Sequence, residues 1–260
     1  MFESEIPGEI DVMEFLEGLS RPRRGAFGGL SRMSAPRAAR LVGVAALTIS
    51  GLQGAFVPPA SAQPCPDVQV LFARGTGEPT GVGSTGQAFI DSLRSRVGGK
   101  SLDVYPVDYP ASKEWSTGLD GITDASNHVE SMAATCPNTK MVLSGYSQGA
   151  AVMGFVTSTA AAEGVDPATV PKPLAPQVAN HIAAVVLYGM PNVRAMDFLG
   201  QPPVVIGPTY AAKTIQICVP EDPVCSDGLS LTAHRTYAND DSFVDQGSDF
   251  AAGRLVTRPL

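Results

Sequence analysis

Short runs made almost entirely of apolar residues alternate with amphipathic segments from residue 68 to the end of this 260-residue chain. Apolar runs this continuous are typical of strands covered on both faces, and their alternation with helices predicts a parallel sheet between two helical layers. We therefore expect an α/β protein, a three-layer α/β/α sandwich. The predicted strands cover 68–73, 102–107, 140–144, 181–188 and 214–218, and the predicted helices cover 84–97, 118–135, 148–162 and 241–257.

The first 62 residues are expected to lie outside this domain. Residues 33–40 carry two arginines, and an apolar run of 17 residues, 41–57, is followed by Ala60-Ser-Ala62. This order is typical of a secretory signal peptide with its cleavage site. Gly and Gln interrupt the run and two prolines end it, which disfavours a membrane anchor. We expect cleavage after Ala62, with an N-terminal extension at 1–32, a signal peptide at 33–62 and the folded domain at 63–260.

A second export route is also compatible with this region. Arg23 and Arg24 form an arginine pair that could belong to a twin-arginine signal. The pair is far from the apolar run, and Met33 lies between them, so this interpretation is the weaker one. On either route the domain would be secreted.

Charge and cysteine content narrow the class of function. The net charge is −7, whereas a protein that tracks nucleic-acid phosphates needs a basic surface, so we expect no nucleic-acid partner. Four cysteines allow two disulfides in an oxidising compartment, with three possible pairings. Pairing Cys218 with Cys225 would leave Cys65 to bond Cys136. Metal binding is the alternative, but C-x6-C without nearby histidines is a poor zinc pattern. We expect no metal and no cofactor.

The segment Gly145-Tyr-Ser-Gln-Gly149 lies where the predicted strand 140–144 ends and the helix 148–162 begins. A serine at such a sharp turn takes strained backbone angles, and glycine on either side leaves room for close packing. The helix N-terminus then places N–H groups and positive potential beside the hydroxyl. The pattern in this context predicts that Ser147 is a nucleophile. The alternative, a glycine-rich turn with a surface serine, leaves both glycines unexplained.

A serine hydroxyl becomes a good nucleophile only when a histidine accepts its proton. The chain has three histidines, His128, His181 and His234. In folds with this motif the chain order is serine, acid, histidine, which favours His234, after the last predicted strand. His128 precedes Ser147 on a predicted helix, so we expect it to be solvated or packed. His181 opens an apolar strand, where we expect a structural role.

The acid that orients the histidine must lie between Ser147 and His234. Asp222 directly follows the last predicted strand, and a disulfide between Cys218 and Cys225 would hold its carboxylate in place. Glu221 is the nearest competitor. The other acids considered are Asp166 and Asp197, in connections rich in proline or glycine, and Asp227, in a predicted turn.

Acyl transfer also needs donors for an oxyanion. The backbone N–H of Gln148, directly after the nucleophile, is one predicted donor. The second is expected from the loop Arg74-Gly-Thr-Gly-Glu78, where Thr76 adds a hydroxyl. A phosphate-binding loop is the alternative, but the chain lacks the G-x-x-x-x-G-K-[ST] pattern.

With these residues in place, the chain resembles the cutinase family, in particular the cutinase-like proteins of mycobacteria and related actinobacteria. The resemblance extends from about Cys65 to the C-terminus. It is carried by Phe-Ala-Arg-Gly-Thr-Gly-Glu at 72–78, Gly-Tyr-Ser-Gln-Gly at 145–149, the C-x6-C loop holding Asp222, and His234.

This resemblance implies a small α/β-hydrolase with two disulfides, a solvent-accessible serine and no large lid. It also implies a catalytic triad and an oxyanion hole. In fungal members a serine stands at the position of Thr76, so the extra methyl group here would stiffen χ1 and either weaken the activity or tune the site to other esters. The implied triad is Ser147, Asp222 and His234, and the implied oxyanion hole is Thr76 and Gln148.

The residues and the resemblance together predict a secreted serine esterase that hydrolyses aliphatic acyl esters through an acyl-enzyme. The family range includes carboxylesterases, lipases, phospholipases and thioesterases. One alternative is a secreted surface-binding protein that has lost catalysis, which the filled triad positions argue against. Another is an esterase of the same fold that acts on acetylated polysaccharide.

We expect a monomer whose partners are an ester or lipid substrate and, transiently, a lipid or polymer surface. A long-chain substrate calls for an apolar rim around the site. Trp115 and the segment 229–231, with Leu229 and Leu231, could form it, and core positions are the alternative.

Overall fold

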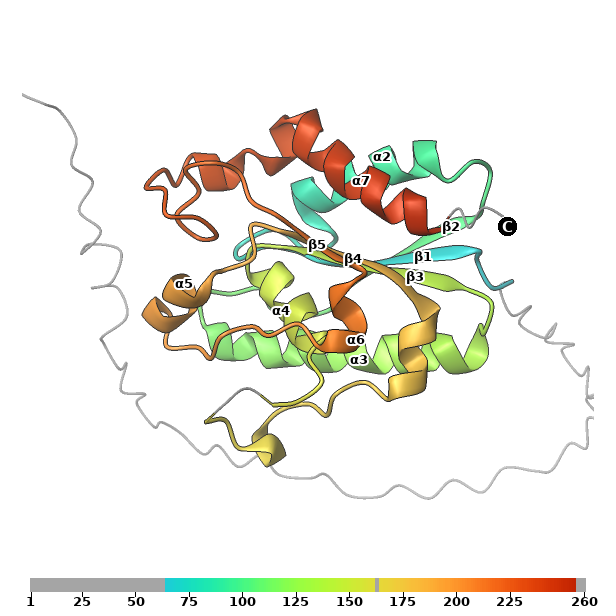
Figure 1. Cartoon of the computed structure of the whole chain (residues 1–260), viewed down its shortest axis with the longest axis horizontal. Helices are drawn as coiled ribbons and strands as arrows, with labels where there is room; N and C mark the ends of the chain where they lie inside the picture. The colour runs from blue at the N-terminus through green and yellow to red at the C-terminus, as the bar shows by residue number, and fades with distance from the viewer. Residues whose placement is uncertain (1–63, 162–163, 256–260) are drawn as a thin grey trace, which may run out of the picture. The chain divides into compact units, whose positions relative to one another are not determined.

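The computed structural model describes residues 64–161 and 164–255, so the predicted extension and signal peptide lie outside the described residues. Its centre is a sheet of five strands, all parallel as expected, and their order is β2-β1-β3-β4-β5 (Figure 1). Among the described residues, no helix is both long and apolar enough to cross a bilayer. The strands are β1 (Val68–Ala73), β2 (Leu102–Pro106), β3 (Lys140–Tyr146), β4 (Ile182–Tyr188) and β5 (Thr214–Ile217).

Helices cover both faces of this sheet (Figure 1). On β3, Val142 belongs to the same buried cluster as Phe89 on one face, and Leu143 belongs to the same cluster as Val152 on the other. This alternation is the period of two expected for a strand buried on both sides. The three-layer α/β/α architecture is confirmed. One face carries α2 (Gly83–Arg96) and α7 (Asp241–Leu255), and the other carries α3 (Gly118–Thr135) and α4 (Gln148–Val156).

The prediction of a helix over 148–162 was wrong at its C-terminal end, because α4 stops at Val156. The carbonyl of Thr157 accepts a hydrogen bond from the N–H of Gly207 (2.9 Å). The hydroxyl of Ser158 donates to the carbonyl of Val205 (2.6 Å). The Gly207 N–H thus occupies the Thr157 carbonyl, which a longer helix would use as a hydrogen-bond acceptor. Two short helices, α5 (Val193–Phe198) and α6 (Pro208–Ala211), were not predicted.

The carboxyl ends of β1 and β3 meet at the point where the strand order reverses. The two strands are neighbours, and Ala73 at the end of β1 is in register with Gly145 near the end of β3. Their following helices, α2 and α4, lie on opposite faces of the sheet (Figure 1). Open α/β sheets bind ligands in the crevice at such a switch point. The loop after β1 and the turn after β3 therefore lie together where a site is expected.

Candidate active site

The turn between β3 and α4 holds Ser147 in a strained conformation, with φ 54° and ψ −118°. Its backbone N–H donates to the carbonyl of Tyr188 at the end of β4 (2.9 Å). A Cβ added to Gly145 would lie 2.3 Å from the carbonyl oxygen of Gly149, and one added to Gly149 would lie 1.9 Å from that of Ala73. Both distances are prohibitive, so the glycines on either side of the serine are a steric requirement.

The structure brings Ser147, His234 and Asp222 into one hydrogen-bonded chain. Ser147 Oγ lies 2.8 Å from His234 Nε2, and His234 Nδ1 lies 2.8 Å from Asp222 Oδ2. The serine and the histidine are both partly exposed, the histidine side chain by 13%, whereas the carboxylate is fully buried. A base aimed at a hydroxyl, itself oriented by a carboxylate, is the arrangement that activates a serine nucleophile.

The buried carboxylate of Asp222 is held in its ionised form. Burial alone would raise its pKa, but hydrogen bonds from His234, from the phenol of Tyr237 and from the N–H of Val224 outweigh it. The pKa of Asp222 consequently lies below its ordinary value of 3.8. An ionised Asp222 fixes the proton of the neutral imidazole on Nδ1 and leaves Nε2 free to accept the serine proton.

Two disulfides are present, Cys65–Cys136 and Cys218–Cys225, as the sequence favoured. The first joins the segment before β1 to the end of α3. The second closes the loop that contains Asp222, directly after β5. Because its two sulfurs are bonded to each other, the cluster of Cys218, Asp222 and Cys225 offers no thiolate to a metal ion.

Gln148 is the first residue of α4, so its backbone N–H is free at the helix N-terminus. Its side chain donates from Nε2 to the carbonyl of Ser112 (3.0 Å) and ties α4 to the segment before α3. This places an N–H donor directly beside Ser147, where the sequence predicts one.

Thr76 is exposed in the loop that follows β1. The carboxylate of Glu78 folds this loop back on itself, because it accepts from the N–H groups of Gly75 (2.7 Å) and Ser84 (3.0 Å). The register of β1 with β3 puts the loop next to the serine turn. A role for Thr76 as oxyanion donor stays a prediction.

Sequence reasoning missed two tyrosines that support the histidine and the acid. The ring of Tyr146 stacks on His234 with 5.2 Å between ring centroids, and its phenol donates to the His234 carbonyl. Tyr237, fully buried, donates to Asp222 Oδ2 (2.7 Å). Tyr146 was visible as the variable residue of the G-x-S-x-G motif, and Tyr237 as an aromatic residue three positions after His234.

The remaining acids and histidines have structural surroundings. The ring of His128 stacks on Tyr105 with 3.5 Å between centroids, and its Nε2 lies 2.9 Å from Gln69 Oε1. Asp227 is fully exposed and pairs with Arg194, as a surface residue does. In addition, Asp166 caps the turn at 167–169, Glu221 is exposed, and His181 ends the turn Pro176–His181.

The predicted apolar rim around the site stays a prediction. Leu229 and Leu231 are 89% and 60% exposed, so the core alternative is wrong for them. They lie in the segment that connects Asp222 to His234. Trp115 is half-buried and lines a cavity beside Gln148.

A parallel sheet with a strained serine turn at the carboxyl end of a central strand defines the α/β-hydrolase class. The sequence pattern of the family described as Cutinase matches residues 64–255, and the chain belongs to this family.

Relatives and a solved structure agree with this assignment. The chain is 58% identical over 167 residues to "Probable carboxylesterase Culp5" of Mycobacterium tuberculosis, covering 64% of this chain and 95% of the relative. It is 42% identical over 222 residues to "Carboxylesterase Culp1" of the same organism, covering 83% of this chain and 95% of the relative. The structure of Trichoderma reesei cutinase with a phosphonate inhibitor superposes with a TM-score of 0.55 at 34% identity, covering 75% of this chain and 78% of the cutinase chain. The protein is a carboxylic ester hydrolase of the cutinase-like group.

Proposed function

We propose that this chain is a secreted serine esterase that hydrolyses aliphatic acyl esters through an acyl-enzyme on Ser147. The observation that carries the proposal is the pair of 2.8 Å contacts linking Ser147 through His234 to the buried Asp222. The positive φ of Ser147 supports it, because backbone strain at a non-glycine residue persists only where the surrounding structure enforces it.

The first half of the reaction forms the acyl-enzyme. His234 Nε2 accepts the proton of Ser147 Oγ while that oxygen forms a bond to the ester carbonyl carbon. The carbonyl oxygen becomes an oxyanion, which the N–H of Gln148 and the donors of Thr76 would stabilise. The intermediate then breaks its bond to the alcohol oxygen, which leaves with the proton from His234.

The second half releases the acid. Water gives a proton to His234 Nε2 and attacks the acyl carbon, and Ser147 Oγ leaves with that proton. Asp222 stays ionised throughout, because its hydrogen bonds hold its pKa below the ordinary range. Its role is to orient the ring of His234 and to stabilise the imidazolium that forms.

The first test is hydrolysis of p-nitrophenyl esters from acetate to palmitate by residues 63–260, beside the Ser147→Ala variant. Loss of turnover by at least about 10⁴-fold in a folded variant is expected. Retained turnover would contradict the assignment of Ser147. A phosphonate ester adds a second readout, because it should label the wild-type serine and leave the variant unmodified.

The same experiment separates the alternatives. A folded, disulfide-intact wild-type chain without turnover or phosphonate labelling would favour a surface-binding protein with a vestigial site. Turnover restricted to acetate would favour an esterase for acetylated polysaccharide. Turnover that rises with acyl length would favour a carboxylesterase or lipase.

Secretion and surface contact are part of the proposal. Two disulfides are typical of secreted proteins, and a signal peptide at 33–62 would deliver the chain to an oxidising compartment. N-terminal sequencing of the secreted protein should give Gln63.

The exposed Leu229 and Leu231 would contact a lipid or polymer surface beside the site, with the protein acting as a monomer. Weaker binding of a Leu229→Ser variant to phospholipid vesicles would test this contact.

A further inference from the structure

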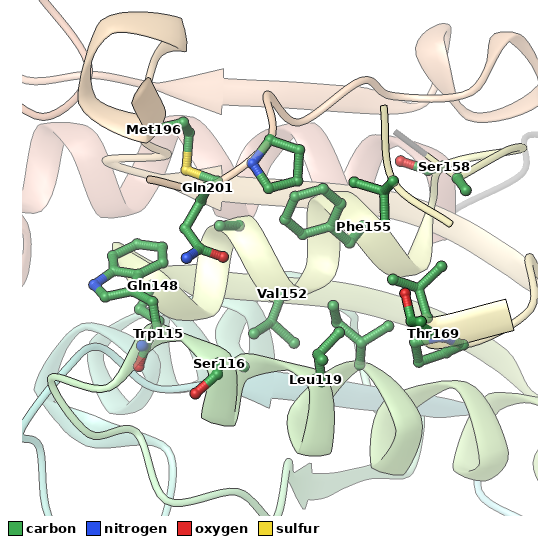
Figure 2. A pocket seen from close by; sticks show the side chains of 18 of the residues that line it. Trp115, Ser116, Leu119, Gln148, Val152, Phe155, Ser158, Thr169, Met196 and Gln201 are labelled. Atoms are coloured by element: carbon green, nitrogen blue, oxygen red, sulfur yellow. The ribbon is translucent and has the colours of Figure 1, made fainter. Parts of the chain in front are cut away.

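A cavity of about 320 Å³ begins at Gln148, the residue that follows the nucleophile. Its walls come from residues 115–122 at the start of α3, from α4, and from residues 158–161, 165–171 and 196–202. Figure 2 shows Trp115, Gln148 and Gln201 at one end and Ser158 and Thr169 at the other. The cavity is therefore elongated, and only one end adjoins the serine.

The middle of the cavity is apolar. Leu119 of α3 faces Val152 and Phe155 of α4 between the two polar ends (Figure 2). Gln148 and Phe155 are seven residues apart on α4, so this wall is about 10 Å long. An acetyl group would leave almost all of that length empty, and an alkyl chain lying along α4 would fill it.

The direction of proton transfer decides which part of an ester, the acyl or the alcohol portion, can enter the cavity. His234 has to return its proton to the leaving alcohol oxygen, so the alcohol portion must lie toward the loop that carries His234. No residue between 203 and 255 lines this cavity. The loop that carries His234 contributes nothing to the walls of the cavity, so of the two parts of an ester the acyl portion is the one that fits there.

We propose that the cavity between α3 and α4 binds the acyl chain of the ester substrate, with the carbonyl carbon at Ser147 and the chain end toward Thr169. Its length then sets the acyl preference of the enzyme, which favours medium and long chains over acetyl. This inference rests on the proposed esterase function and adds the location of the acyl site.

Two variants shorten the cavity at different depths. Leu119→Trp fills its middle, and Thr169→Trp fills its far end; both side chains are partly or wholly exposed, so the fold should tolerate them. Asn127→Trp is the matched control, because Asn127 is exposed on α3 and does not line the cavity.

The readout is kcat/KM for p-nitrophenyl acetate, octanoate and palmitate. Leu119→Trp should lower the octanoate and palmitate values about tenfold or more and leave acetate within about twofold. Thr169→Trp should lower palmitate alone, and Asn127→Trp should match the wild type. Octyl acetate, which carries its chain on the alcohol, should be hydrolysed equally well by Leu119→Trp and the wild type.

A crystal structure of the protein labelled with a dodecyl phosphonate gives a direct check, with the alkyl chain expected between Leu119 and Phe155. An alkyl chain lying over Leu229 and Leu231, or an octanoate-to-acetate ratio that Leu119→Trp leaves unchanged, would overturn the inference while leaving the esterase intact. Absence of turnover and of phosphonate labelling in the wild type would overturn both.

Discussion

The phenol of Tyr237 donates a hydrogen bond to Asp222 Oδ2, the same oxygen that lies against His234 Nδ1; the two distances are 2.7 and 2.8 Å. The phenol oxygen also accepts from the N–H of Val219, just after β5. Burial, with the nearby Asp222 carboxylate, raises the pKa of Tyr237 far above its ordinary value, so the phenol keeps its proton. Tyr237 therefore fixes the carboxylate that fixes the histidine.

Replacement of Tyr237 by Phe should lower kcat about tenfold, because a hydrogen bond to a charged group is worth about 1.5 kcal/mol or more. KM should change little, since Tyr237 is fully buried and does not reach the substrate. Steady-state kinetics on a short-chain ester measures both. Tyr188→Phe is the control, because this buried phenol donates to the Val244 carbonyl and not to Asp222. Equal kcat values for the two variants would contradict the positioning role.

Replacement of Asp222 by Asn should lower kcat by roughly 10⁴-fold, because an amide no longer favours the required imidazole tautomer. It should also change how stability depends on pH. The folded pKa of Asp222 is below its ordinary value of 3.8, so its ionised form stabilises the fold above that value. This contribution is lost as the pH falls through the folded pKa.

Urea unfolding of the wild type and Asp222→Asn should therefore show a difference at neutral pH that shrinks at successive steps below pH 3.8. A difference that stays constant across those steps would mean that the carboxylate is not stabilised in its ionised form.

Replacement of Ser147 by Gly should abolish turnover but raise the free energy of unfolding above that of Ser147→Ala. Glycine adopts a φ of 54° without steric cost, whereas a residue with a Cβ is strained by about 1 kcal/mol or more. Thermal or urea unfolding of the two inactive variants compares them directly. Equal stability would show that the turn is unstrained.

The two disulfides should have separable effects. Their sequence separations are 71 and 7 residues, for which the loop-entropy relation gives about 4.4 and about 2.5 kcal/mol. Replacing Cys65 and Cys136 by Ser should cost more stability and leave kcat nearly unchanged, since that bond is remote from Asp222. Replacing Cys218 and Cys225 by Ser should cost less stability and lower kcat. Unfolding curves and kinetics of the two double variants test this, and the opposite ranking of kcat would contradict it.

The features of this protein that depend on residues close together in the chain could be predicted from its sequence. The continuous apolar runs predicted the five strands because burial on both faces leaves no room for polar positions. The glycines around Ser147 predicted the strained turn, because backbone atoms of Gly149 and Ala73 exclude a Cβ at each position. The order of serine, acid and histidine along the chain predicted His234 as a partner of Ser147. The loop closed by Cys218 and Cys225 predicted Asp222 as the other partner.

Other features are formed by segments that lie far apart in the chain, and these were decided only by the tertiary structure. The alanines at 160–162 favour helix, yet α4 stops at Val156, where Thr157 and Ser158 form hydrogen bonds to residues 205–207. Tyr237 reaches Asp222 because the segment before α7 packs against the end of β5. The cavity exists because α3, α4 and the segments 165–171 and 196–202 leave a space between them. Local patterns carry steric and burial preferences, whereas these features depend on long-range packing, which no short stretch of sequence encodes.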